Sequence, residues 1–300
     1  MQDFPTIPLV AVDWGTTHRR AYAMGHDSQC LATHQDDQGA LAARGRFAAS
    51  LREAVAALGV APQRIVLTGM VGSALGWHNV PYVGAEVALG ALGAHLFHVP
   101  DAADLPPTYI APGYCVRNAL GRPDVMRGEE TQLLGAVASG TSSGLFVLPG
   151  THSKWVALHA GRVQALRTYM TGELFALLGQ HGTLAAAANQ LQEDSPVAFA
   201  QGVADSAEAA LSHQLFATRA RVVCGDLAAS QAHAYLSGVL IGAELRDALP
   251  LRSDPSLPVY LIGSAALAAR YVQAATLLQA PVTALDAPSL YLAAMAALLP

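Results

Sequence analysis

The chain has 300 residues, of which 52% are hydrophobic and 13% are charged, and its formal net charge is −5. This balance allows a large buried core, and the lack of a basic block excludes nucleic acid as an expected partner. Neither an apolar run of membrane-spanning length nor a leader pattern occurs, so we expect a cytoplasmic protein. Cys30, Cys115 and Cys224 are widely spaced, which indicates reduced thiols in place of a disulfide framework or a zinc site.

The first half of the chain is predicted to open with a meander of strands. Alternating or apolar runs and helical spacing predict three strands, a helix and a fourth strand: 7–13, 19–24, 29–35, 46–58 and 64–68. The Pro-rich stretch 100–113 is expected to be a loop, and 128–138 is expected to be a helix.

The second half repeats this order. Three strands are predicted first, at 144–148, 154–159 and 163–169. Helices are then expected at about 173–180, 197–216 and 227–248. The last predicted elements are a strand, a helix, a strand and a closing apolar helix: 258–262, 265–278, 281–285 and 287–300. Two halves that each open with a meander and continue with α/β units predict a duplicated, two-lobed α/β architecture.

We therefore expect four parts in the chain. They are an N-terminal lobe, a connecting helix, a C-terminal lobe and a terminal helix that packs back toward the interlobe region: 1–127, 128–142, 143–286 and 287–300.

Two Gly/Thr-rich turns, far apart in the sequence, each follow a strand-like run. The first is Asp13-Trp14-Gly15-Thr16-Thr17, and the second is Pro149-Gly150-Thr151-His152-Ser153-Lys154. Such turns let backbone N–H groups and hydroxyls approach a phosphate without interference from a Cβ atom. The pair predicts a nucleotide held between two related lobes, with these phosphate contacts: Gly15, Thr16, Thr17, Gly150 and Thr151.

Two charged residues accompany these turns. A carboxylate beside a triphosphate would be repelled unless Mg²⁺ lay between them, so Asp13 is expected to hold the metal through water. The alternative is an ordinary Asx turn. Lys154 is the only lysine of the chain and adds a point charge for the phosphates. Its alternative is a solvated strand residue.

Five longer motifs resemble those of a known family: Val12–Thr17, Gly69–Ser73, Met126–Gly135, Leu148–Val156 and Met170–Glu173. Over nearly its whole length the chain resembles the 2-dehydro-3-deoxygalactonokinase family of the actin/sugar kinase/Hsp70 superfamily. The resemblance implies an α/β, ribonuclease H-like fold of two lobes with a nucleotide cleft between them. It also implies a transferase that uses ATP and Mg²⁺ to phosphorylate O6 of 2-dehydro-3-deoxy-D-galactonate, in galactonate catabolism.

The same resemblance implies catalytic roles. Glu129 aligns with the catalytic aspartate of the broader carbohydrate-kinase group, one methylene longer, and Glu130 is the alternative base. Acids in the first turn of a helix are, however, favoured by the helix dipole alone. Arg20 stands where related kinases carry an arginine near the transferred phosphoryl group, whereas Arg19 is expected to face solvent.

Substrate contacts are implied at six positions: Gly72, Ser73, Trp77, Arg127, Thr171 and Glu173. Arg127 directly precedes the proposed base and suits a carboxylate or a phosphate. Trp77 fits the core equally well, and Thr171 with Glu173 fits the start of a helix. Gly263 and Ser264 follow a late strand, where the superfamily packs adenosine.

Three alternatives stay open. The substrate could be another 2-keto-3-deoxy sugar acid, because no short motif encodes the orientation of a hydroxyl. An actin-like or chaperone-like nucleotide switch would belong to another class, although the chain lacks a long substrate-binding extension. A zinc-bearing glucose-type kinase is disfavoured by the absence of a Cys/His cluster from the sequence. A homodimer through the apolar C-terminal helix is also left open.

Overall fold

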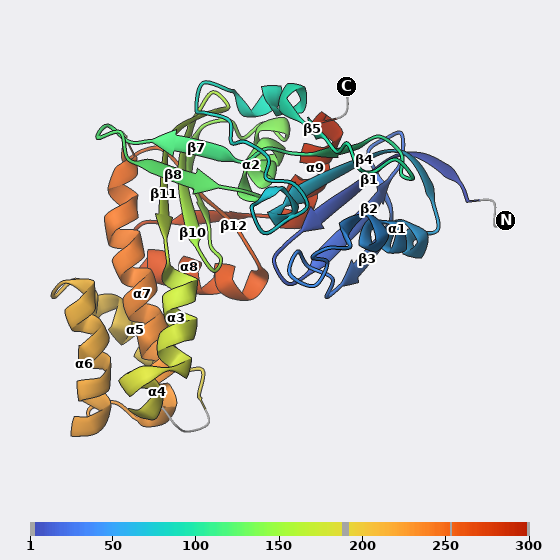
Figure 1. Cartoon of the computed structure of the whole chain (residues 1–300). Coiled ribbons are helices and arrows are strands. Elements are labelled where there is room, and N and C mark those ends of the chain that lie inside the picture. The colour runs from blue at the N-terminus through green and yellow to red at the C-terminus, as the bar shows by residue number, and fades with distance from the viewer. Residues whose placement is uncertain (1–3, 188–191, 253, 299–300) are drawn as a thin grey trace. The chain divides into compact units, whose positions relative to one another are not determined.

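The computed structural model describes three ranges: 4–187, 192–252 and 254–298. The chain forms two compact units, each with a sheet of its own (Figure 1). Unit 1 groups three stretches: Met1–Ser143, Leu158–Leu166 and Asp286–Pro300. Unit 2 groups two: Gly144–Ala157 and Arg167–Leu285. The four-part division expected from the sequence stays a prediction.

Unit 1 is built on a six-stranded sheet in the order β3-β2-β1-β4-β6-β5. Its strands are β1 (Thr6–Trp14), β2 (Arg19–Met24), β3 (Cys30–Asp36), β4 (Ala61–Gly69), β5 (Phe97–His98) and β6 (Thr108–Ile110). A separate hairpin joins β7 (Tyr114–Arg117) and β8 (Pro123–Met126). Its helices are α1 (Phe47–Leu58), α2 (Glu129–Ala138) and α9 (Ala287–Leu298), with short 3₁₀ turns at η1 (Met70–Gly72) and η2 (Leu89–His95).

Strand β1 occupies the middle of this sheet, antiparallel to β2 and parallel to β4. Its run Leu9–Val12 is fully buried, as expected for a central strand covered on both faces. Trp14 packs edge-on against Phe47 of α1 on one face. On the other face Tyr291 of α9 contacts Tyr22 and lies 3.2 Å from the Thr68 hydroxyl.

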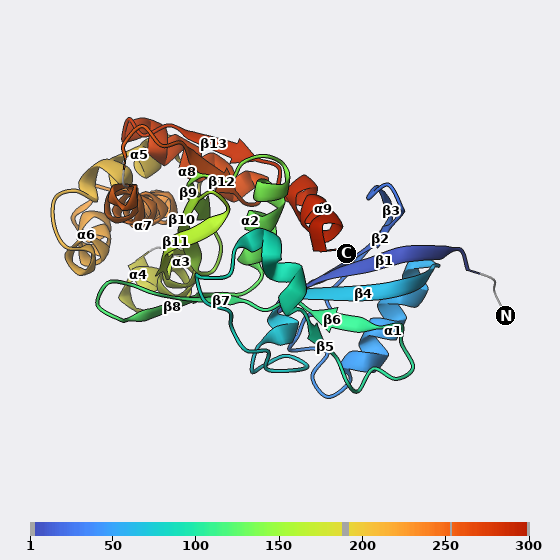
Figure 2. The same cartoon turned by 90° about the horizontal axis from the view of Figure 1, so that it is seen from above.

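Helix α9 packs beside α2 within unit 1, as both views show (Figures 1 and 2). Its buried side chains are Leu290, Tyr291, Ala294, Met295 and Leu298. The apolar face of this helix is therefore used inside the unit. Among the described residues, every helix is too short or too polar to cross a membrane.

Unit 2 carries most of a five-stranded sheet in the order β11-β10-β9-β12-β13, in which β12 is parallel to both of its neighbours, whereas the Leu158–Leu166 part of β10 and β11 groups with unit 1. Its strands are β9 (Gly144–Leu148), β10 (Ser153–His159), β11 (Arg162–Tyr169), β12 (Val259–Ile262) and β13 (Val282–Leu285). Its helices are α3 (Thr171–Gln180), α4 (Gly182–Ala187), α5 (Pro196–Asp205), α6 (Leu211–Cys224), α7 (Ala232–Ala248) and α8 (Ala265–Leu277), with 3₁₀ turns at η3 (Ala229–Gln231) and η4 (Leu249–Leu251).

The two sheets share one plan, because the first three strands of each half form a meander and a later strand joins the first in parallel. This confirms the predicted duplicated α/β architecture. Several details differ from the sequence prediction, beginning with β5 and α4, which were not predicted. The expected loop 100–113 contains β6, the β7–β8 hairpin was not predicted, the expected helix 197–216 is two helices, and the helix expected from 227 begins at Ala232.

The break between α5 and α6 has a local cause. The Ser206 hydroxyl donates to the Val203 carbonyl at 2.7 Å, and the buried carboxylate of Asp205 accepts a hydrogen bond from the Tyr235 hydroxyl at 2.6 Å. A serine hydroxyl that bonds back to a carbonyl of the preceding turn, as Ser206 does, weakens or bends a helix. The apolar spacing alone continues across this point, so the sequence predicted one helix.

Candidate functional site

The first phosphate turn follows β1, and Asp13 stands at its start. The register places Asp13 opposite Arg20 on β2 and Thr68 on β4. Arg20 Nη1 lies 3.8 Å from Asp13 Oδ2, and the Asp13 side chain is 37% exposed. Burial of this carboxyl group raises its pKa, and the Arg20 charge opposes that shift.

Asp13 suits a divalent cation that keeps most of its waters. Its carboxylate gains stability from added positive charge, since burial penalises its ionised form. Within the part of the chain that the structure describes, there is no group of three His, Cys, Asp or Glu residues able to hold a metal. A single carboxylate with substrate phosphates is the usual protein contribution to a Mg²⁺ site.

The turn after Asp13 is braced by the segment 38–41. Trp14 Nε1 donates to the Gln38 carbonyl at 2.8 Å, and the Ala40 N–H donates to the Gly15 carbonyl at 2.9 Å. The side chains of Thr16 and Thr17 are exposed. The turn is therefore held through its backbone, and its two hydroxyls are available to a ligand.

Two glycines bring the end of β1, the Gly69 turn and the start of α2 together within unit 1. Gly69 has φ of +85° and Gly128 has φ of +109°, a backbone region that favours glycine. A Cβ atom added at Gly69 would stand 2.9 Å from the Trp14 carbonyl oxygen and 3.6 Å from Asp13 Oδ1. One added at Gly128 would stand 3.4 Å from Gly69 Cα. Asp13 thus lies near the Arg127–Glu130 segment.

Arg127 lies against the Gly69–Ser73 turn with part of its guanidinium group unsatisfied. Its Nη2 donates to the Val80 carbonyl at 2.6 Å, and its guanidinium carbon lies 4.3 Å from the centre of the Tyr82 ring. A Cβ atom added at Gly72 would stand 2.7 Å from Nη1. Nε and Nη1 are buried without a hydrogen-bond partner among the described residues. An unpaired buried donor costs about 1–3 kcal/mol.

Glu129 and Glu130 form the first turn of α2, and their environments differ. Glu129 Oε2 accepts from the Arg127 N–H at 3.0 Å, and Glu130 Oε2 accepts from the Gly128 N–H at 2.7 Å. Glu130 is fully buried. Burial, with the charge of Glu129 as the smaller cause, raises the pKa of Glu130 to about 8. At neutral pH Glu130 therefore holds its proton, whereas Glu129 is only partly buried.

The raised pKa of Glu130 predicts how stability depends on pH. The pKa of Glu130 is about 8 in the folded chain and 4.5 ordinarily. Its contribution to the free energy of unfolding is therefore full below pH 4.5 and is lost as the pH rises through about 8. The loss is at most about 1.4 kcal/mol per pH unit. We expect Glu130→Gln to become more stable relative to the wild type from about pH 5 to about pH 8 in urea unfolding. Parallel curves for the two proteins would contradict the assignment.

The structure shows what two other residues of unit 1, Ser73 and Trp77, contact. The Ser73 hydroxyl donates to the Met70 carbonyl at 2.7 Å, so it serves the turn itself. Trp77 stacks on Phe47 and donates from Nε1 to Asp101 at 3.0 Å, which supports its core alternative.

The expectation that Arg19 faces solvent is wrong, because Arg19 is 1% exposed. Its guanidinium group bonds to Asp36 and to the Ser50 hydroxyl, at 2.5 Å and 2.7 Å. Alternation along β2 places Arg19 on the α1 face and Arg20 on the other face.

The second phosphate turn packs against the start of α3 within unit 2. The Glu173 N–H donates to the Thr151 carbonyl at 2.9 Å, and His152 Nε2 lies 2.5 Å from Glu173 Oε2. A Cβ atom added at Gly172 would stand 2.3 Å from the Gly150 carbonyl oxygen. Glu173 is thus tied to the turn, as expected for a residue that supports it.

Lys154 is buried, with 7% of its surface exposed, and its Nζ donates to Thr168 Oγ1 at 3.1 Å. The alternative of a solvated strand residue is therefore wrong. Gly263 borders the same turn, because a Cβ atom added there would stand 3.4 Å from Pro149 Cδ. The second phosphate turn and the predicted adenosine turn are neighbours in unit 2.

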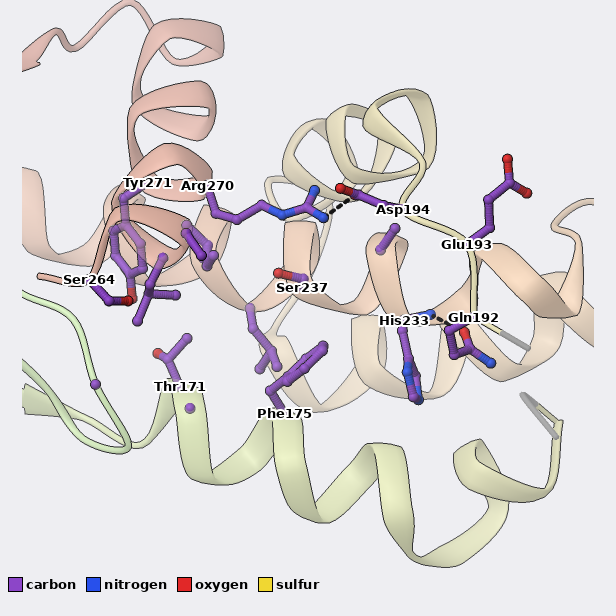
Figure 3. Close-up of a pocket in the computed structure, with 17 residues that line it drawn as sticks. Thr171, Phe175, Gln192, Glu193, Asp194, His233, Ser237, Ser264, Arg270 and Tyr271 are labelled. Carbon is purple, nitrogen blue, oxygen red and sulfur yellow. Dashed lines mark hydrogen bonds and ion pairs between the residues drawn. The ribbon is translucent and has the colours of Figure 1, made fainter. Parts of the chain in front are cut away.

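A cavity of about 530 Å³ in unit 2 has residues of both turns, Gly150 and Ser264, in its lining. Ser264, Thr171 and Tyr271 lie at one end of it, and His233 lies at the other (Figure 3). The ion pair of Arg270 with Asp194 stands along its side.

Sequence reasoning missed several side chains that line this cavity: Phe175, His233, Arg270 and Tyr271. They come from three helices and do not form a sequence motif. The only signal in the sequence was the position of Ser264 before a helix.

Comparison with known proteins agrees with these features. The chain matches the model of the 2-keto-3-deoxy-galactonokinase family over residues 13–298. It is 37% identical over 281 residues to the 2-dehydro-3-deoxygalactonokinase of Escherichia coli (strain K12), and the match covers 93% of each chain.

Two solved structures show the fold. A 2-dehydro-3-deoxygalactonokinase candidate from Sinorhizobium meliloti superposes with a TM-score of 0.87 at 35% identity, covering 97% of this chain and 95% of that one. Component A of the (R)-2-hydroxyglutaryl-CoA dehydratase of Acidaminococcus fermentans gives a TM-score of 0.52 at 10% identity, over 97% and 96% of the two chains, and so shows the fold alone. The predicted actin-like ATPase and sugar-kinase fold is confirmed. The chain belongs to the 2-keto-3-deoxy-galactonokinase family, whose name describes a phosphotransferase with an alcohol acceptor.

Proposed function

We propose that this chain transfers the γ-phosphoryl group of ATP to O6 of 2-dehydro-3-deoxy-D-galactonate, giving 2-dehydro-3-deoxy-6-phosphogalactonate in galactonate catabolism. The proposal is supported by one observation in unit 1: Asp13, the Gly69–Ser73 turn and the Arg127–Glu130 segment lie close together. A carboxylate base, a cation for an anionic substrate and a metal-binding carboxylate are the groups that phosphoryl transfer requires.

In this proposal Glu129 accepts the proton of the attacking hydroxyl. Its carboxylate is partly exposed and so within reach of a substrate hydroxyl, while the raised pKa of Glu130 keeps that residue protonated. Arg127 offers the unpartnered donors Nε and Nη1 to the carboxylate of the sugar acid. Both donors are buried beside Gly72, so we expect the side chain to shift when the substrate binds.

For ATP we propose contacts in both units. Gly15, Thr16, Thr17 and Arg20 serve the phosphates from unit 1. Gly150, Thr151 and Lys154 serve them from unit 2, and the cavity beside Gly263 and Ser264 takes the nucleoside.

Mg²⁺, when bound near Asp13, would neutralise charge on the phosphate oxygens. Asp13 suits this role, since it is a lone carboxylate whose charged form is penalised by burial. Asp13, at the end of β1, would hold the hydrated cation through its carboxylate.

A coupled ADP-release assay over epimeric 2-keto-3-deoxy acids tests the proposed activity. We expect kcat/KM for 2-dehydro-3-deoxy-D-galactonate to exceed that for the gluconate-derived epimer by at least about tenfold, since a mispositioned hydroxyl leaves polar groups unpaired. A higher value for another acid would reassign the substrate within the same reaction. ADP release that does not depend on any sugar acid would contradict the kinase and favour the nucleotide switch.

A further inference from the structure

Glu244 is a buried carboxylate that the proposed reaction does not use. It lies on α7, 3% exposed. Trp155 Nε1 donates to its Oε1 at 2.7 Å, and the Tyr271 hydroxyl donates to its Oε2 at 2.9 Å. The Thr171 hydroxyl also donates to Oε2. All three donors are neutral groups, and burial raises the pKa of this carboxyl group above its usual value. A buried carboxylate is costly unless hydrogen bonds satisfy it.

The partners of Glu244 belong to the segments that carry the two nucleotide turns. Trp155 lies on β10, which begins directly after the Gly150–Thr151 turn. Thr171 begins α3, whose next residue packs against the Gly150 carbonyl. Tyr271 lies on α8, which begins directly after Ser264.

Ser153 also belongs to the cluster around Glu244. Ser153, the residue that begins β10, lies with its hydroxyl 2.8 Å from the Tyr271 hydroxyl. Ser153 is also a side-chain hydrogen-bond partner of Glu244 itself. The two oxygens of Glu244 are thus the acceptors on which the Trp155, Thr171 and Tyr271 donors converge.

We propose that Glu244 is a positioning residue that fixes the Gly150–Thr151 turn and the Gly263–Ser264 turn for nucleotide binding, through Thr171, Tyr271 and Trp155. The proposal rests on the proposed function, in which these turns bind ATP. Glu244→Gln would leave at least one donor of the cluster without an acceptor, because the amide nitrogen that replaces one carboxylate oxygen cannot accept a hydrogen bond. The turns would then lose their common anchor while the volume of the side chain stays the same.

Glu244→Gln tests the proposal, with the Kd for ATP measured by titration in the absence of sugar acid. We expect the Kd to rise by about tenfold, the scale of a lost hydrogen bond to a charged group, while KM for the sugar acid changes by less than about twofold. Tyr271→Phe removes the hydroxyl between Ser153 and Glu244 and should raise the Kd in the same direction. It keeps the test available if the first variant does not fold.

Asp205→Asn is the matched control. Asp205 is another buried carboxylate of unit 2, bonded to Tyr235 at 2.6 Å and to Arg221 at 3.0 Å, and it joins helices away from the turns. It should lower Tm without changing the Kd for ATP. A wild-type protein that binds no ATP would refute the proposed function and this role with it. Wild-type binding with an unchanged Kd in both Glu244→Gln and Tyr271→Phe, or an equal rise in Asp205→Asn, would refute only the positioning role.

Discussion

Replacement of Glu129 by Gln is expected to lower kcat by at least about a hundredfold, the lower end of a general-base contribution. The amide keeps the shape of the side chain and can still accept the Arg127 N–H, which the carboxylate accepts at 3.0 Å. It cannot take a proton from the substrate hydroxyl. The Kd for ATP should therefore stay within about threefold of the wild-type value, since proton acceptance is not part of nucleotide binding.

Glu130→Gln is the control for this experiment, because the two residues are neighbours in one helical turn. Glu130 is fully buried with a pKa raised to about 8, so at neutral pH it already resembles an uncharged amide. We expect this variant to keep most of its turnover. If Glu130→Gln instead loses about a hundredfold while Glu129→Gln keeps its rate, the base is Glu130. Steady-state rates at saturating substrate and ATP titration decide between the two results.

The strands that carry the phosphate turns could be predicted because their signals are local. Apolar runs such as 7–13 and 144–148 end at Gly/Thr-rich turns, and β1 and β9 stand where those runs lie. By contrast β6 has only three residues, flanked by prolines. A strand of this length has no measurable period, so its place beside β4 depends on tertiary pairing.

Arg19 and Arg20 show where local reasoning ends. Two adjacent arginines on a strand must face opposite sides of the sheet, but the sequence does not say which side each takes. The register with β1 settles this by pairing Arg20 with Asp13. Arg19 consequently points toward α1, where Ser50 and Asp36 satisfy it.

The candidate site divides in the same way. Glu129 and the turn residues belong to short motifs that resemble those of a family, so they could be identified as site residues from the sequence. Whether the two phosphate turns contact one nucleotide stays a prediction. Glu244 and Tyr271 are 27 positions apart, and both lie far along the chain from the Gly150–Thr151 turn. Only helix packing brings such residues together, and no spacing rule in one sequence encodes it.

Gly172→Ala is expected to impair ATP use strongly, because the new methyl group would meet backbone atoms. A Cβ atom there would stand 2.3 Å from the Gly150 carbonyl oxygen and 2.9 Å from Thr151 Cα. Neither contact can be relieved by turning a side chain, so the second phosphate turn must move by roughly 1 Å, a displacement that can cost about a hundredfold in rate. We expect the Kd for ATP to rise and kcat/KM for ATP to fall by at least about a hundredfold.

Gly179→Ala provides the comparison, since it places the same methyl group in the same helix, α3. There a Cβ atom would meet only the His233 ring, at 3.0 Å from Nε2, and a side chain can yield where a backbone cannot. Alanine is also favoured over glycine inside a helix by up to about 1 kcal/mol, so this variant should fold at least as well as the wild type. ATP titration and thermal melting of both variants separate loss of the turn from loss of the helix. Equal ATP binding by Gly172→Ala and Gly179→Ala would mean that the turn does not hold the phosphates, because only the first substitution displaces it.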